Sequence, residues 1–269
     1  MKRACFYQNT NLHENGGMRV LPSSRDKLSG NLKTNCFRMK KWLLLPVVFF
    51  SVWGSANAQR EKWGTWTSFG VEKKLDKWNF GAETELRTIY AVRLIDRWSI
   101  SLDADYALIK PLKVGVGYQL MNTLDTKYLN YQLRNRFSGW VTGKQKWGKW
   151  SVSLRERLQV TVKDDSKRID DNGGIDTYKI NPAWVWRNKL NLSYNIRKNP
   201  ITPGFSVETF YELNNPDGNQ FNNFRYTLYA DYKLNKHNVL EVYGLINQKT
   251  DEDEDYGKYI IGLSFTHSF

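Results

Sequence analysis

The residues best suited to chemistry are charged side chains spaced two apart along several segments of the chain. Three basic pairs have this spacing: Arg134 and Arg136, Arg155 and Arg157, and Arg187 and Lys189. The acidic residues with a similar arrangement are Glu83, Glu85, Asp103, Asp105, Glu208 and Glu212. A spacing of two places both members of a pair on one face of a β-strand. Paired arginines suit phosphates and sugar acids, because each guanidinium group donates two parallel hydrogen bonds.

Apolar and polar residues alternate through most of the chain after Gln59, which indicates half-buried β-strands. We expect an all-β fold with no helix and no internal domain boundary in this part. The eleven strand candidates are 63–72, 78–90, 98–108, 112–121, 129–141, 150–162, 182–196, 205–213, 224–234, 239–247 and 258–269. The first two are expected to pair across a tight turn at Lys74 and Leu75.

Alternation alone also fits a soluble antiparallel sheet with one wet face, but three features favour a transmembrane β-barrel. Most runs have the 10 to 14 residues that a tilted strand needs to cross a bilayer. Trp140, Trp147 and Trp150 lie near strand ends, as in interfacial aromatic girdles. Phe265 and Phe269 end an alternating strand, as in the insertion signal of outer-membrane barrels. We therefore predict an antiparallel up-and-down barrel of 10–12 strands, and the even-number rule for bacterial barrels narrows this to ten or twelve.

The N-terminal part is predicted to be removed from the mature protein. Residues 39–58 combine a basic start, a short apolar segment and a small-residue site, which predicts a signal peptide cleaved after Ala58. Residues 1–38 are interpreted as a mis-assigned start or a disordered extension, and 59–269 as the barrel. The chain from Gln59 has 31 basic and 25 acidic residues and no cysteine. The small net charge argues against a nucleic-acid partner. An exported chain without cysteine fits a Gram-negative periplasm or outer membrane, and a barrel there would contact outer-membrane lipid and the barrel-insertion machinery.

The connections between strands alternate in length, as expected for a barrel with short periplasmic turns. The short ones are 110–113, 143–149, 196–203 and 234–239, and the longer, outward ones are 163–177, 214–223 and 248–257. The acidic run at 251–255 has two interpretations, a divalent-cation site or, more commonly, a solvated loop.

The hairpin at 129–162 predicts a register if its turn is centred on Gln145 and Lys146. Leu133 then faces Leu158, Phe137 faces Leu154, and Val141 faces Trp150. The same register sets Arg134 against Arg157 and Arg136 against Arg155, although like charges in direct opposition are unfavourable.

The predicted lumen therefore has a basic arc that faces acidic arcs. Two outcomes are open: the arcs meet as salt bridges and close a narrow barrel, or water separates them and small solutes pass. A third use is the binding of a small anionic solute.

On the outer face, Asn135 is predicted to meet Glu156, with Asn188 at a similar depth on the next strand. Polar residues are costly on a lipid face. Either a local bulge turns them inward, or they form a contact with lipid headgroups or with a second protomer of a homo-oligomer.

No catalytic, metal or cofactor site is predicted. The chain after Gln59 has two histidines, His237 in a predicted periplasmic turn and His267 on the last strand, and neither lies near the outer rim. Two functions remain: a narrow channel for small solutes, or a structural or ligand-binding barrel that acts through its outer loops.

Four sequence features resemble the bacterial outer-membrane barrels grouped as domain of unknown function 2490. They are Trp78-x-Phe80-x-x-Glu83-x-Glu85-Leu86-Arg87, Leu112-Lys113-Val114-Gly115-Val116-Gly117-Tyr118, Arg155-x-Arg157-Leu158 and the final Phe269. Gln132 departs from the pattern, which has an acidic residue two positions before Arg134. The resemblance spans roughly 63–269 and implies an outer-membrane barrel, with no established activity.

Overall fold

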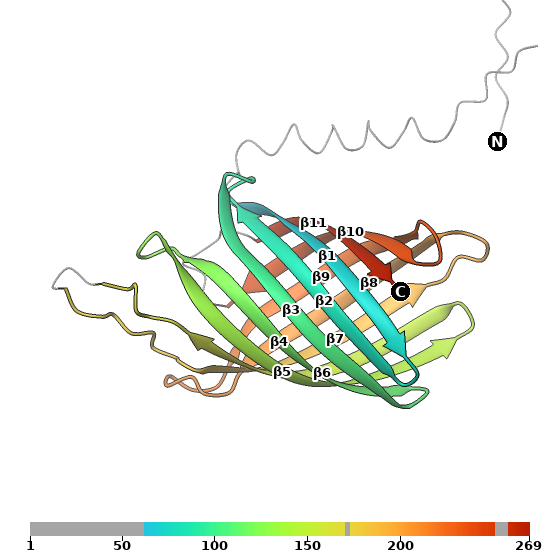
Figure 1. The fold of residues 1–269 in the computed structure, drawn as a ribbon, viewed down its shortest axis with the longest axis horizontal. Helices are drawn as coiled ribbons and strands as arrows, with labels where there is room; N and C mark the ends of the chain where they lie inside the picture. Colours follow the sequence, from blue (N-terminus) through green and yellow to red (C-terminus); the bar gives the residue numbers. More distant parts are fainter. Residues whose placement is uncertain (1–61, 170–172, 251–257) are drawn as a thin grey trace, which may run out of the picture. The chain divides into compact units, whose positions relative to one another are not determined.

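Eleven β-strands form a closed barrel in the computed structural model (Figure 1). The structure describes residues 62–169, 173–250 and 258–269. The strands are β1 (Trp63–Leu75), β2 (Trp78–Ile89), β3 (Leu94–Ile109), β4 (Leu112–Asp125), β5 (Asn130–Trp147), β6 (Trp150–Lys163), β7 (Ala183–Tyr194), β8 (Ile201–Glu212), β9 (Phe221–Lys233), β10 (Asn238–Lys249) and β11 (Tyr259–Ser268). The predicted all-β barrel is confirmed. In these described ranges, no helix is long and apolar enough to cross a membrane.

The strand count corrects the prediction of ten or twelve. Consecutive strands pair antiparallel, and β1 pairs with β11 in parallel, from Trp63 opposite Tyr259 to Glu72 opposite Ser268. An odd number of alternating strands leaves the first and last running in the same direction, so a parallel pair must close the barrel. The even-number rule is therefore wrong for this barrel.

The connections alternate between two ends of the barrel. The short-turn end carries 76–77, 110–111, 148–149, 195–200 and 234–237, together with Phe269. The long-loop end carries 90–93, 126–129, 164–182, 213–220 and 250–258. This is the predicted alternation, although the β1–β2 turn lies at Asp76 and Lys77 rather than at Lys74 and Leu75, since Leu75 pairs with Trp78.

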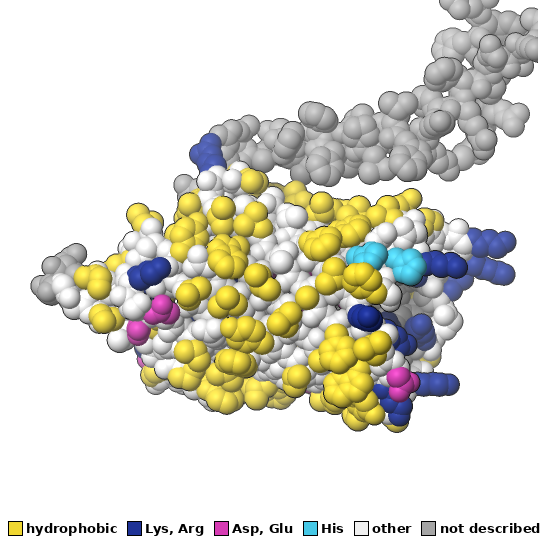
Figure 2. All heavy atoms as spheres, viewed as in Figure 1, with side chains coloured by type: hydrophobic (Ala, Val, Ile, Leu, Met, Phe, Trp, Pro, Cys, Tyr) yellow, Lys and Arg dark blue, Asp and Glu magenta, His cyan; other side chains and the backbone are white. Residues whose placement is uncertain are grey.

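The outer surface is rich in exposed apolar side chains (Figure 2). Leu102, Val116, Phe137 and Leu228 are among the most exposed of them. The buried apolar cluster found among the described residues is small, by contrast, and consists of Trp66, Leu245 and Ile260, with Tyr243 against it. A soluble sheet protein would enclose its apolar faces, so an apolar exterior around a polar interior is typical of a barrel in lipid.

The β5–β6 register differs from the predicted one. Trp147 pairs with Trp150, and the two-residue turn is Gly148 and Lys149, with Gly148 at φ +59°. Glycine adopts this left-handed conformation without steric cost, which favours a turn here over one at Gln145 and Lys146. Each pairing moves by six residues, an even number, so every side chain keeps its predicted face.

The new register also changes the predicted charge contacts. Arg134 lies opposite Lys163, and Arg136 lies opposite Thr161. Arg134 and Lys163 are again like charges, and two further like-charge pairs lie between β6 and β7, where Arg155 lies opposite Lys189 and Arg157 opposite Arg187.

Candidate functional site

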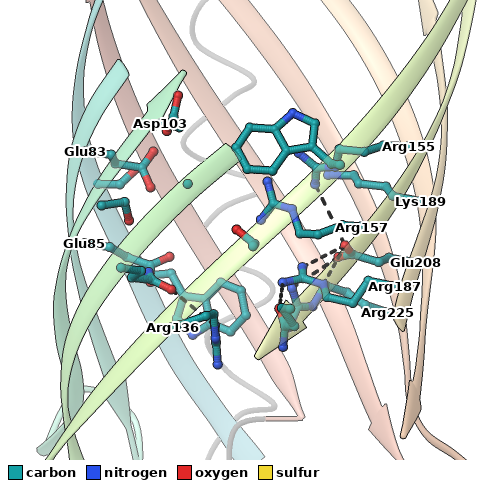
Figure 3. Close-up of a pocket in the computed structure, with 18 of the residues that line it drawn as sticks. Glu83, Glu85, Asp103, Arg136, Arg155, Arg157, Arg187, Lys189, Glu208 and Arg225 are labelled. Atoms are coloured by element: carbon teal, nitrogen blue, oxygen red, sulfur yellow. Dashed lines mark hydrogen bonds and ion pairs between the residues drawn. The ribbon is translucent and has the colours of Figure 1, made fainter. Parts of the chain in front are cut away.

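A cavity of about 970 Å³ occupies the barrel interior. The basic residues lining it include all of Arg134, Arg136, Arg155, Arg157, Arg187 and Lys189. The acidic residues lining it include Glu83, Glu85, Asp103, Glu208 and Glu212. Asp105 does not line it, but accepts a hydrogen bond from Trp140, which does. In Figure 3, Glu83 and Asp103 lie on one wall, and Arg155, Arg157 and Lys189 lie on the wall across from them.

The first ion-pair network centres on Glu208, whose side chain is 4% exposed. Its Oε1 lies 2.7 Å from Arg187 Nη2 and 3.9 Å from Arg155 Nη2. Its Oε2 lies 3.5 Å from Arg225 Nη1. One carboxylate therefore serves three guanidinium groups from β6, β7 and β9.

The second network centres on Glu85 of β2. Its Oε1 lies 2.7 Å from Arg87 Nε and 3.1 Å from Arg97 Nη2. Both networks join residues on the same or nearby strands, so they run along the wall. Within the described residues, Glu83 and Asp103 form no ion pair with the basic wall that they face.

Trp66 of β1 connects the two networks. The Arg87 guanidinium lies 3.5 Å from the centre of its ring, and that of Arg225 lies 4.9 Å from it. A second cavity of about 440 Å³ lies toward the long-loop end. The two cavities share Trp66, Arg87, Arg134, Arg225 and Lys249, so these residues form the boundary between them.

Trp140 lies inside the barrel, which corrects its assignment to an interfacial girdle. It is 8% exposed, and its indole Nε1 donates to Asp105 Oδ1 at 2.7 Å. The Arg157 guanidinium lies 4.5 Å from the centre of its ring. The indole covers Gly115 and Gly117 of β4, where a Cβ atom would collide with it or approach within 3.0 Å. The absence of side chains at these glycines thus makes room for Trp140. Trp147 and Trp150, by contrast, are exposed beside their turn.

A hydrogen-bonded cluster orders the long-loop end. Arg168, in the 164–182 connection, pairs with Asp125, and its Nη2 lies 2.9 Å from Asp176 Oδ2. Tyr178 donates to Asp125 at 2.9 Å, and its ring lies 4.0 Å from the Arg168 guanidinium. The cluster attaches this loop to the end of β4, at the mouth of the smaller cavity.

Asp176 is a second acceptor in this cluster, beside Asp125. Hydrogen bonds from Lys127, Tyr128 and Arg168 hold the pKa of its carboxyl well below the usual value, because all three stabilise the charged form.

The outer-face patch divides into two parts. Glu156 lies opposite Asn188, as expected from their similar depth, but Asn135 lies opposite Val162. Neither ladder is interrupted at these residues, so the bulge interpretation is wrong. Trp186 Nε1 donates to Glu156 Oε2 at 2.9 Å, and Tyr118 donates to Asn135 at 2.7 Å. The Asn188 side chain is oriented so that both its amide nitrogen and its oxygen form hydrogen bonds. The nitrogen donates to Glu156 Oε1 at 3.1 Å, and the oxygen accepts from the Thr209 hydroxyl.

The remaining predicted residues lie away from the cavity. Phe265 stacks on Phe69 across the closing pair, and Phe269 is 71% exposed. His237 and His267 lie together at the short-turn end, with ring centroids 6.2 Å apart. Among the described residues, no group of three or more His, Cys, Asp or Glu side chains is placed to hold a metal. The signal peptide and the acidic run at 251–255 fall outside these residues.

Arg87, Arg97, Arg225, Trp66 and Trp140 were missing from the predicted site. Their inward position was nevertheless available from the alternation. Arg225 shares its face with Thr227, Arg97 with Ser99, and Trp140 with Arg136. The period-two pattern reports which face a residue occupies, and only the closed barrel shows that Arg87 and Arg225 meet at Trp66.

The chain matches one protein family and is similar to two solved barrel structures. A family model described as protein of unknown function (DUF2490) matches residues 63–258. The β domain of the Bordetella autotransporter BrkA is similar at 11% identity and TM-score 0.44, covering 72% of this chain and 83% of that one. A porin is similar at 14% identity and TM-score 0.30, covering 68% of this chain and 56% of that one. No curated protein matches.

The family match spans β1 through β10 and confirms the resemblance stated from the sequence motifs. The chain belongs to the DUF2490 family.

Proposed function

We propose that this protein is an integral outer-membrane barrel whose charged lumen admits small solutes. The observation that carries the proposal is the inversion of polarity, with an apolar outer surface around a 970 Å³ cavity lined by charged residues. An apolar outer surface is stable against lipid acyl chains, and a charged cavity is stable when it is filled with water. The short-turn end then faces the periplasm, and the long-loop end faces outward.

The separation of the two charged walls favours a solute path over a closed barrel. Glu83 and Asp103 face the basic wall across the cavity without pairing with it, so water and a solute have room between them (Figure 3). Trp66, between Arg87 and Arg225, is then the gate that a solute passes from one cavity to the other.

Conductance of the purified protein in planar bilayers tests this function. We expect small ohmic openings whose ion selectivity changes when Arg134→Glu and Arg155→Glu are combined, because both residues line the cavity. Heat-modifiable gel migration verifies that each variant is folded. Absence of openings from folded protein contradicts the channel, and recovery of the processed protein from the soluble fraction contradicts the membrane location.

The alternative function, a barrel that binds a partner through its outer loops, is favoured by one observation. Within the 164–182 connection, Arg168 and Tyr178 are bonded to Asp125 at the end of β4, and Arg168 also pairs with Asp176. Deleting 165–174 distinguishes the two functions. A channel keeps its conductance, whereas a loop-based binder loses its partner.

A further inference from the structure

The wall formed by β6 to β9 has more positive than negative groups. Six cationic side chains line the cavity there: Lys163 at the long-loop end of β6 and, around Glu208, Arg155, Arg157, Arg187, Lys189 and Arg225. Within the described residues, Glu208 is the one carboxylate within 4 Å of any of them. Arg187 and Arg225 hold its oxygens, and Arg155 lies at the 3.9 Å limit.

Of the five cations around Glu208, Arg157 and Lys189 are the two that form no ion pair with its carboxylate. In the described parts of the chain, neither forms an ion pair or a side-chain hydrogen bond, and the buried Nε of Arg157 has no partner. Arg157 and Arg187 are direct cross-strand neighbours, as are Arg155 and Lys189. Like charges in this position repel each other, so a bound anion would relieve the repulsion.

The Arg157 side chain is held in place without a carboxylate. Its guanidinium lies over the Trp140 ring, which is itself fixed by its hydrogen bond to Asp105 and by its seat on Gly115 and Gly117. The donors of Arg157 are therefore positioned before any ligand arrives, which lowers the entropic cost of binding.

Neutral hydrogen-bonding groups complete the site. Ser138, Thr142, Ser153 and Asn191 line the same cavity, and its volume falls within the range of small-molecule sites. The carboxylates of Glu83 and Asp103 lie on the opposite wall, where they could accept hydrogen bonds from the hydroxyl groups of a ligand anchored by its anionic end (Figure 3).

We propose that Arg155, Arg157 and Lys189 bind the phosphate or carboxylate group of a small polyhydroxylated solute, with its hydroxyl groups toward Glu83 and Asp103. The proposed site would identify the class of solute that the channel admits. The proposal rests on the proposed function in one respect, which is that the solute must be able to reach the lumen.

Isothermal titration calorimetry of the full-length protein in detergent tests the site with three probes: glucose 6-phosphate, glucuronate and glucose. We expect saturable binding of at least one charged probe and none of glucose. Binding of glucose 6-phosphate indicates a phosphate ligand, and binding of glucuronate indicates a carboxylate ligand. Equal behaviour of all three probes overturns the proposal, and this comparison requires no variant.

Variants then locate the site. Arg157→Gln and Lys189→Gln should each weaken binding about tenfold, as expected for loss of a charged hydrogen bond. Lys189→Arg should retain it. Arg197→Gln, in the exposed β7–β8 turn, is the matched control and should bind as the wild type. Unchanged affinity in folded Arg157→Gln and Lys189→Gln overturns the proposal.

Calorimetry does not require conduction, so the two proposals fail separately. A barrel that binds glucose 6-phosphate but does not conduct contradicts only the channel. A barrel that conducts but binds none of the probes contradicts only the anion site.

Discussion

Arg87 lies over Trp66, with 3.5 Å between its guanidinium carbon and the centre of the indole ring. Arg225 approaches the same ring from β9, so one side chain of β1 joins groups from two distant parts of the wall. These three residues line both cavities, so their contact lies where the cavities meet.

Trp66→Ala should increase single-channel conductance severalfold, because removal of the indole opens the boundary between the cavities. The variant should also lose about 3–5 kcal/mol of unfolding free energy, as is usual for a buried Trp replaced by Ala. Planar-bilayer recording and urea unfolding in lipid measure the two effects. Trp98→Ala, on the outer face, is the control and should keep the wild-type conductance. Unchanged conductance in folded Trp66→Ala would show that Trp66 is not the gate.

Glu208→Gln should destabilise the barrel and increase its preference for anions. The substitution keeps the size of the side chain but leaves Arg187 and Arg225 without their buried carboxylate. Loss of one partner of a buried ion pair costs about 3–5 kcal/mol. Urea unfolding and reversal potentials in a salt gradient measure the two changes.

The control for Glu208→Gln is Asp217→Asn, which removes an exposed ion pair with Lys179. Exposed pairs contribute about 0–1 kcal/mol, so this variant should be nearly neutral. Equal stability of the two variants contradicts the role given to Glu208.

Gly115→Ala should destabilise the barrel by about 1–3 kcal/mol, because the new methyl group collides with Trp140 and Asp105. Gly244→Ala is the matched control in β10, where no heavy atom lies within 4 Å of the added carbon. Urea unfolding compares the stability of the two variants, and heat-modifiable gel migration verifies that each is folded. A neutral Gly115→Ala would mean that Trp140 moves away freely.

The alternating pattern predicted the barrel and its faces because strand periodicity is local. It placed all six basic residues on the face that lines the cavity. The β5–β6 register was not predictable in the same way, since apolar matches exist in more than one alignment and Gly148 decides the turn. The eleven alternating runs matched the observed strand number, and the even-number rule wrongly replaced it. Closure between β1 and β11 is non-local, so no segment of the sequence reports the parallel pair or the meeting of Arg87 and Arg225 at Trp66.

The Arg168 cluster should make the long-loop end sensitive to acid through its Asp176 carboxylate. Hydrogen bonds lower the pKa of this carboxyl in the folded state, so its contribution to stability is present above its unfolded pKa of about 4. The contribution is lost as the pH falls below this value toward the lowered pKa. The difference in thermal midpoint between the wild type and Asp176→Asn should therefore be largest near pH 7 and shrink below pH 4. A difference that is constant with pH contradicts this role.

Glu156→Leu tests whether the outer polar patch is a protomer interface. The carboxylate already accepts hydrogen bonds from Trp186 and Asn188 of the same barrel, so what remains costly is an ionised group beside lipid. A second protomer would shield that group, and the leucine variant would remove the reason for the contact. The interface hypothesis therefore predicts that Glu156→Leu shifts an oligomer to monomers in analytical ultracentrifugation in detergent. Leu158→Ala, two residues along the same outer face, should leave the oligomeric state unchanged. If Glu156→Leu also leaves it unchanged, the interface hypothesis is wrong, and the hydrogen bonds from Trp186 and Asn188 are what stabilise this carboxylate on the outer face.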